Sequence, residues 1–108
     1  MIIEMRIYHC APGHLAALCN SFEATSFPFW EKHGIRQAGF FTTLIGPSNQ
    51  TLTYLLKWDS LAERERIWTN FVTDPEWVAS RKASAATAPV VERVETSFLT
   101  PTAFSALR

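Results

Sequence analysis

The chain has 108 residues, of which 47% are hydrophobic and 13% aromatic, so residues 1–108 can bury one core as a single domain. Ten basic residues balance ten acidic ones and no basic run occurs, which excludes the electrostatic footprint of a nucleic-acid-binding protein. Its apolar stretches are too short for a membrane span. The two cysteines form no CxxC pair and favour free thiols in a reducing compartment, so we expect a cytoplasmic protein.

Residues 2–9, IIEMRIYH, alternate between apolar and polar side chains and predict a β-strand with two unlike faces. One face carries Ile3, Met5 and Ile7, and the other carries Glu4, Arg6 and Tyr8. We expect Glu4 and Arg6 to lie near Arg93 and Glu95 of the last strand, because opposite charges on neighbouring strands attract one another. The favoured interpretation of this polar face is therefore a cross-strand charge ladder.

A long helix is predicted next, because apolar residues recur at helical spacing from Leu15 to Trp30. Pro28 interrupts it, since an interior proline removes a hydrogen bond and clashes with the preceding turn. We expect the helix to kink or restart there. It ends at residues 32–34, KHG, where Gly34 supplies a left-handed cap.

Residues 35–46 and 51–58 are rich in β-formers and flank the turn formers of GPSNQ, which predicts an antiparallel hairpin. Ser60 and Glu63 then form an S-x-x-E capping box, a pattern typical of a helix start. The sequence therefore predicts a second helix directly after the hairpin.

Asp74 begins another short helical piece, residues 79–89 form a small polar connection, and residues 90–99 are a final strand. The order β-α-β-β-α-β predicts an α+β fold, a four-stranded antiparallel sheet with both helices on one face. Such a sheet leaves its other face open. A second copy of the chain packing there, as a symmetric homodimer, would cover it.

Six stretches, in order over nearly the whole chain, resemble the NIPSNAP family: EMRIY, KHGI, IGPSNQ, WDSLAERER, DPEW and LTPTAFSALR. The resemblance implies a ferredoxin-like, dimeric α+β barrel, in which two sheets face each other and the helices lie outside. We expect the charge ladder to lie inside such a barrel. Relatives with this barrel include cofactor-independent monooxygenases, haem-degrading enzymes, cyclases and isomerases, whose sites lie between sheet and helices. The family carries no agreed catalytic motif that could be transferred to this chain.

Arg64 is the one charge of SLAERERIW, residues 60–68, that falls inside the apolar stripe of the second helix, beside Trp68. An arginine there can pair with a carboxylate, extend its head group to water or bind an anionic ligand. The structural outcomes are favoured, because buried arginines usually have protein partners. Arg64, Arg6, Tyr8 and Trp68 are the candidate ligand-binding residues.

His33 and Tyr8 are the candidate catalytic residues. An imidazole pKa of about 6.5 suits proton transfer, although a histidine before a capping glycine is also a common helix-end residue, which is the favoured interpretation. Tyr8 could donate a hydrogen bond in a cavity. The sequence contains no paired carboxylates, nucleophile elbow, phosphate loop or metal-ligand cluster, so we predict no cofactor and no metal.

Two classes of function remain. The first is a homodimer that binds a small apolar or aromatic molecule between sheet and helices, with any reaction being monooxygenase-like or isomerase-like. The second is a non-catalytic interaction module whose surface or C-terminal PTAFSALR segment docks a partner. Pro101, Phe104 and Leu107 would pack that tail on its own dimer. A cavity holding polar groups such as Arg64 or Tyr8 favours the first class, and a solidly packed interface favours the second.

Overall fold

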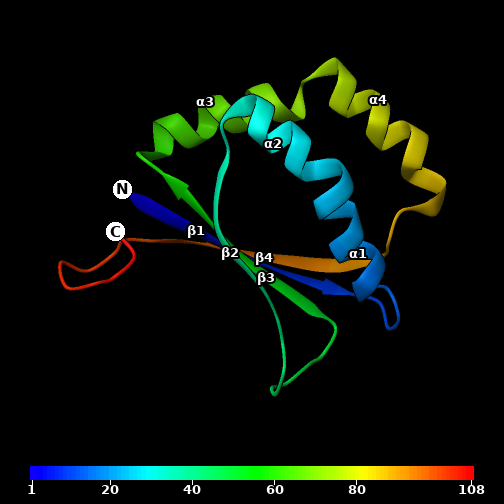
Figure 1. The fold of residues 1–108 in the computed structure, drawn as a ribbon, viewed down its shortest axis with the longest axis horizontal. Helices are drawn as coiled ribbons and strands as arrows, with labels where there is room; N and C mark the ends of the chain where they lie inside the picture. The colour runs from blue at the N-terminus through cyan, green and yellow to red at the C-terminus, as the bar shows by residue number, and fades with distance from the viewer.

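The computed structural model describes all of residues 1–108. Its elements are, in chain order, β1 (Ile2–Cys10), α1 (Leu15–Ser21), η1 (Phe22–Ser26), α2 (Phe27–His33), β2 (Arg36–Thr42), β3 (Thr51–Trp58), α3 (Leu61–Val72), α4 (Pro75–Ser84), η2 (Ala85–Thr87) and β4 (Val91–Leu99). The strands form one antiparallel sheet in the order β2-β3-β1-β4, and the helices cover one of its faces (Figure 1). The predicted ferredoxin-like α+β fold is confirmed.

The helix over β1 and β3 runs without a break through a π-helical middle, η1. The backbone N–H of Phe27 bonds to the carbonyl of Phe22, five residues back. Pro28 therefore lies in the first turn of α2, where its missing N–H costs little. The interruption expected at Pro28 thus takes the form of a π turn. Gly34 ends α2 in the left-handed conformation, with φ 78°.

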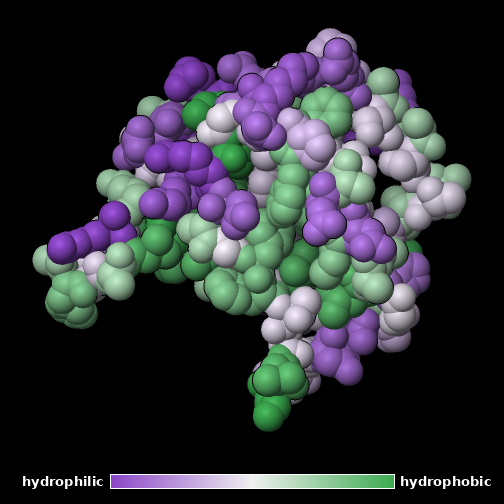
Figure 2. All heavy atoms as spheres, viewed as in Figure 1, coloured by the Kyte–Doolittle hydropathy of each residue, from purple (hydrophilic) through white to green (hydrophobic).

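β2 is shorter than the sequence predicts and ends at Thr42, opposite Leu52. Leu44 and Ile45, expected to belong to this strand, lie instead in the β2–β3 loop and are 95% and 93% exposed. The loop forms because Gly46 and Pro47 cannot continue a paired strand. It projects from the sheet on the side opposite the helices, and its tip is hydrophobic (Figures 1 and 2).

α4 is longer than expected, because residues 79–84 continue the helix in place of a connection. Asp74 caps its start by accepting a hydrogen bond from the backbone N–H of Glu76 at 2.9 Å. Alanine, arginine and lysine are good helix formers and extend the capped turn. Trp77 and Arg81, four residues apart, consequently lie on one face of α4.

The polar face of β1 lies under the helices, and its apolar face lies on the open side of the sheet. The expected charge ladder with Arg93 and Glu95 is wrong. Arg6 lies opposite Thr96, so the register places Glu95 on the other face, where it hydrogen-bonds to His9 at 2.5 Å. This hydrogen bond lowers the pKa of Glu95. The alternation of apolar and polar residues could not reveal the pairing register. It shows which residues of one strand share a face, but not which residue of the neighbouring strand each of them pairs with.

The hydrophobic core fills the space between the sheet and the helices. Its buried members are Cys10, Leu18, Phe22, Trp30, Ile35, Leu52, Tyr54, Leu56, Trp58 and Phe71. Tyr54 and Phe40 stack with ring centroids 4.6 Å apart, and Phe22 packs edge-on against Tyr54. No helix of the chain has the length and hydropathy needed to cross a membrane.

Candidate functional site

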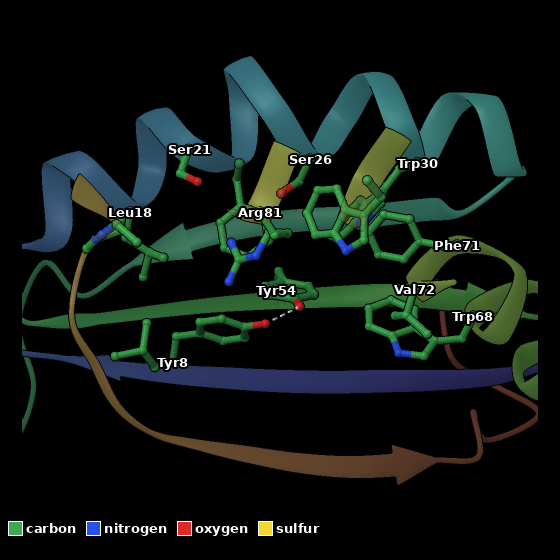
Figure 3. A pocket seen from close by; sticks show the side chains of 15 residues that line it. Tyr8, Leu18, Ser21, Ser26, Trp30, Tyr54, Trp68, Phe71, Val72 and Arg81 are labelled. Carbon is green, nitrogen blue, oxygen red and sulfur yellow. Dashed lines mark hydrogen bonds between the residues drawn. The ribbon is translucent and has the colours of Figure 1, made fainter. Parts of the chain in front are cut away.

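A cavity of about 250 Å³ lies between the sheet and the helices (Figure 3). It is slightly smaller than the roughly 300–1,000 Å³ of pockets that hold drug-sized ligands. Eleven of its fifteen lining residues are hydrophobic. The lining consists of Tyr8, Leu18, Ser21, Phe22, Ser26, Trp30, Tyr54, Trp68, Phe71, Val72, Trp77, Arg81, Ala88, Pro89 and Val91. The arrangement can enclose a small, mostly apolar molecule and offers it a few polar contacts.

Two tyrosine hydroxyls lie side by side on the sheet side of the cavity. Tyr54 donates a hydrogen bond to the Tyr8 oxygen at 3.3 Å, and Arg6 Nη2 donates to the same oxygen at 3.2 Å. A hydroxyl oxygen has two lone pairs and one proton. Because both lone pairs of Tyr8 accept, its own proton is free to donate to a group in the cavity. Burial raises the pKa of Tyr54, so that residue stays a neutral phenol.

Trp30 brings a further donor to the cavity from α2. Its side chain is almost fully buried, with 3% of its surface exposed. Its indole Nε1 nevertheless has no hydrogen-bond partner in the protein. A buried donor without a partner is costly, by roughly 1–3 kcal/mol. Nε1 is itself closed off from solvent, so an acceptor oxygen on a bound molecule would remove that cost after a small movement of the indole ring.

Glu4 lies fully buried behind the tyrosines and collects four hydrogen bonds. It accepts from Trp58 Nε1 at 3.0 Å, from Arg64 Nε and Nη2 at 3.1 and 3.2 Å, and from Arg6 Nη1 at 3.3 Å. Two guanidinium groups therefore surround one carboxylate, which leaves this buried cluster with an excess positive charge. The helical period correctly turns Arg64 toward the sheet, where its partner is Glu4, and Arg64 does not line the cavity.

Trp68 links the Glu4 cluster to the cavity. Its ring lies under both guanidinium groups, 5.4 Å from Arg6 and 5.1 Å from Arg64, and it also lines the cavity. Burial disfavours the charge on Arg6, but the oxygens of Tyr54, Tyr8 and Glu4 outweigh that effect and raise its pKa. Arg6 therefore stays a permanent cation behind the Tyr8 hydroxyl.

His33 lies outside the cavity, at the end of α2. Its Nε2 is 2.7 Å from Asp74 Oδ2, and Lys32 Nζ donates to the same oxygen at 2.7 Å. The hydrogen bonds from Lys32 and His33 hold the pKa of Asp74 well below its usual range. Lys32, His33 and Asp74 together join the end of α2 to the turn between α3 and α4. We call this contact the Asp74 clamp, and it gives His33 the structural role of a helix-end residue.

A second depression of about 250 Å³ lies beside edge strand β2. It is lined by Cys19, Phe22, Glu23, Phe27, Phe40, Phe41, Thr42 and Leu52. Its only charged group is a carboxylate, and neither buried unpaired nitrogen of the protein, Arg6 Nε or Trp30 Nε1, belongs to its lining. The first cavity is therefore the stronger candidate for a ligand site.

The polar lining residues that sequence reasoning did not single out are Arg81, Tyr54, Ser21 and Ser26. The spacing of Arg81 four residues after Trp77 is the local signal that could have found it, once residues 79–84 were recognised as helix. Tyr54 carries no comparable signal, because an alternating strand tyrosine looks like any core residue. Of the candidates named from the sequence, Tyr8 and Trp68 line the cavity.

The model of the NIPSNAP family matches residues 3–106 of the chain. The chain belongs to the NIPSNAP family. A NIPSNAP family protein from Agrobacterium tumefaciens is 25% identical to this NIPSNAP chain, with 99% of this chain and 98% of that chain covered at a TM-score of 0.86. An uncharacterised NIPSNAP-like domain protein from Burkholderia xenovorans is 28% identical, covering 96% and 87% at a TM-score of 0.82. No curated protein matches the sequence.

A more distant similarity extends to MhuD, here a mutant with two manganese protoporphyrin IX molecules bound per active site. It is 15% identical over 94% of this NIPSNAP chain and 95% of that chain, with a TM-score of 0.60, which shows a common fold alone. No group of three or more His, Cys, Asp or Glu side chains is placed to hold a metal ion here.

Proposed function

We propose that this NIPSNAP protein binds a small, mostly apolar or aromatic molecule in the cavity between sheet and helices. The observation that carries the proposal is the unpaired Nε1 of Trp30 in an aromatic cavity. Aromatic walls favour a flat apolar body, and the two available donors, Trp30 and Tyr8, favour an oxygen acceptor on it. An interaction module would need no such cavity.

The lining residues do not fit a haem. Protein-bound haem iron takes an axial ligand such as His, Cys, Met or Tyr, and the first three are absent from the cavity lining. The lone pairs of Tyr8 are occupied by Arg6 and Tyr54, and Tyr54 is itself fully buried and donates its proton to Tyr8. The volume also lies below the range for drug-sized ligands, which favours a molecule of about one aromatic ring.

A single contact supports a second candidate function, acid–base catalysis on the bound molecule. Tyr8 can donate its proton to a ligand oxygen while the guanidinium of Arg6 stabilises negative charge on the tyrosine oxygen 3.2 Å away. Such a donor would stabilise the enolate oxygen of an isomerase-like enolisation or of a cofactor-independent oxygenation, and water would have to take the ligand proton, because no carboxylate or imidazole lines the cavity. Tyr8→Phe would then retain binding and abolish turnover.

The binding proposal is tested by filling the cavity. Ser21 lines it and Ala24 lies exposed on the same helix, so Ser21→Phe should block the cavity and Ala24→Phe should not. Acetophenone, a one-ring ketone, is titrated while tryptophan fluorescence is recorded, because three tryptophans line the cavity. We expect saturable quenching in the wild type and Ala24→Phe, none in Ser21→Phe, and an affinity about tenfold weaker in Trp30→Phe.

Equal titration curves for the Ser21→Phe and Ala24→Phe variants would contradict binding in this cavity. Native mass spectrometry of freshly purified protein provides an independent readout. A mass adduct that is present in wild type and absent in Ser21→Phe would support the proposal and give the mass of the natural ligand.

We propose that the open face of the sheet is covered by a second copy of the chain. Phe41 and Leu99 on this face are 54% and 43% exposed, and Met5 and Leu55 between them are only half-buried. The β2–β3 loop carries its apolar tip beyond the same face, where it could clasp a partner (Figure 1). Light scattering that gives a monomer mass at micromolar concentration would overturn this proposal.

We propose that the protein resides in the cytoplasm, a reducing compartment, because its two cysteines form no disulfide. Cys10 and Cys19 are free thiols, and Cys10 is buried within the core. Burial raises the pKa of the Cys10 thiol, which keeps it protonated and unreactive. Thiol titration of protein purified without reductant, giving two free thiols only after unfolding in denaturant, would support this placement, and a disulfide would contradict it.

A further inference from the structure

Arg81 is the only charged residue among the fifteen that line the cavity. It reaches from α4 toward the side of the cavity that holds the hydroxyls of Tyr8 and Tyr54 (Figure 3). Its guanidinium has no hydrogen bond or ion pair with any other residue of the chain. It lies over the ring of Trp77, with 5.5 Å between the guanidinium carbon and the ring centroid. An arginine stacked on an aromatic face keeps its outer N–H groups available for an anion.

The surroundings of Arg81 favour negative charge in the cavity. No aspartate or glutamate lines it, so no protein carboxylate competes for the guanidinium there. Arg81 is itself exposed to solvent, so its attraction for an anion rests chiefly on the paired hydrogen bonds that its planar guanidinium can form. The cluster of Arg6, Arg64 and Glu4 beneath the tyrosines adds a further excess positive charge.

We propose that the cavity selects a small aromatic carboxylate, with the carboxylate on Arg81 and the ring among the tryptophans. The planar guanidinium forms two parallel hydrogen bonds to a carboxylate, which fixes the orientation of the ring as well as its charge. A second oxygen on the ligand would then meet the donors of Tyr8 and Trp30. This inference rests on the proposed ligand site and adds the chemical class of the ligand.

The test compares charged and neutral probes of equal shape. Benzoate, phenylacetate and 3-phenylpropanoate are titrated beside their three amides, with isothermal calorimetry and tryptophan fluorescence as readouts. We expect at least one carboxylate to bind at least tenfold more tightly than its amide, because a charge-assisted hydrogen bond is stronger than a neutral one. Arg81→Gln should reduce that preference to less than about threefold while the amide binds as before.

The neighbouring residue Lys82 provides the matched control. It is an exposed cation on the same helix and does not line the cavity, so Lys82→Gln removes the same charge and should keep the preference. A preference that survives in Arg81→Gln, or that Lys82→Gln removes equally, would overturn the role of Arg81. Tight binding of amides and carboxylates alike would overturn the ligand class but keep the ligand site. Absence of binding by all six probes and by acetophenone would overturn both.

Discussion

The carboxylate of Glu4 is fully buried and fixes the positions of the side chains around it. A buried charge is unfavourable unless hydrogen bonds and an opposite charge compensate it. Glu4 has both, because it accepts four hydrogen bonds, three of them from the guanidinium groups of Arg6 and Arg64. The carboxylate also holds Arg6 in the position from which it reaches Tyr8. The positions of the polar groups around the Tyr8 hydroxyl thus depend on Glu4, which does not itself line the cavity.

Glu4→Gln should lower the free energy of unfolding by about 2–4 kcal/mol, because the amide leaves two guanidinium groups without a counter-charge and turns an N–H group toward them. Urea denaturation measures the change. Glu65→Gln, an exposed carboxylate on α3, is the control and should change stability by less than about 0.5 kcal/mol. A loss below about 1 kcal/mol in Glu4→Gln would contradict the role of the cluster.

Asp74 predicts a dependence of stability on pH. Its pKa is lowered in the folded protein by hydrogen bonds from Lys32 and His33, so its contribution is present above the unfolded pKa of about 3.9 and is lost as pH falls below it. Asp74→Asn keeps an N-cap acceptor but removes the charge. The variant should be less stable than wild type at pH 7, and the gap should narrow by pH 3.

Thermal melts at pH 7, 5 and 3 measure that gap. Asp59→Asn is the control, because Asp59 pairs with Arg36 at the exposed surface and should show little dependence of this kind. A gap that stays constant from pH 7 to pH 3 would show that the charge of Asp74 is not what stabilises the clamp.

The residues of the site could be predicted only in part. Helical spacing on α3 correctly turns Arg64 inward, and strand alternation correctly places Tyr8 with Glu4 and Arg6. Neither rule identifies the contact between Arg64 and Glu4, which are 60 positions apart in sequence. That contact depends on how a helix and a strand dock after folding, and no local pattern encodes it.

Among the helices and strands, the sequence correctly predicts the ends that are marked by a capping residue. The Ser60 hydroxyl accepts the predicted hydrogen bond from the Glu63 backbone at 3.1 Å, and Gly34 caps α2 as expected. Local rules fail where signals are weak. Residues 79–84 look like a polar connection because they carry no apolar stripe, yet the cap at Asp74 and good helix formers suffice.

Gly39 sits at an irregularity of β2 that local rules do not reveal. The register with β3 shifts between Gln37 and Gly39, and Gly39 has φ 144°, a conformation that other residues rarely adopt. An added Cβ would also lie 2.8 Å from the ring of Phe41. We expect Gly39→Ala to lower the free energy of unfolding by about 2 kcal/mol, measured by urea denaturation.

The same substitution in a Phe41→Ala background separates the two causes. Removing the ring relieves the clash and leaves the backbone strain, so the loss from Gly39→Ala should become smaller but persist. An unchanged stability in both backgrounds would show that β2 shifts its register at no cost.

At the scale of the whole molecule, the fold is a thin two-layer plate, 44 × 38 × 19 Å, with helices on one side only. Its topology was predictable because element order and the antiparallel hairpin leave few alternatives for four strands. The faces of the sheet were less predictable. The polar side of β1 was expected to form a charge ladder with the last strand inside a dimer barrel, yet it lies under the helices, where its charges pair with one another and with Arg64.

Leu55→Lys tests the proposed assembly, because Leu55 lies near the middle of the open face, opposite Met5. A lysine between two packed sheets would be buried without a partner, so the variant should be monomeric at concentrations where wild type is dimeric. Analytical ultracentrifugation measures this. Asn70→Lys, on the exposed surface of α3, should leave the mass unchanged. A dimer that tolerates Leu55→Lys would exclude this face as the interface.

The contact between Glu4 and Arg64 also constrains how the chain can fold. If β1 slipped by one residue against β3, Ile3 or Met5 would lie beneath the guanidinium of Arg64, and Glu4 would point to the open face together with Arg6. Arg64 would then lie under the sheet without its counter-charge. Apolar packing alone would tolerate the slip, because β1 has isoleucines on both of its faces. The ion pair between Glu4 and Arg64 therefore stabilises one pairing register of β1 with β3 and disfavours the registers shifted by one residue.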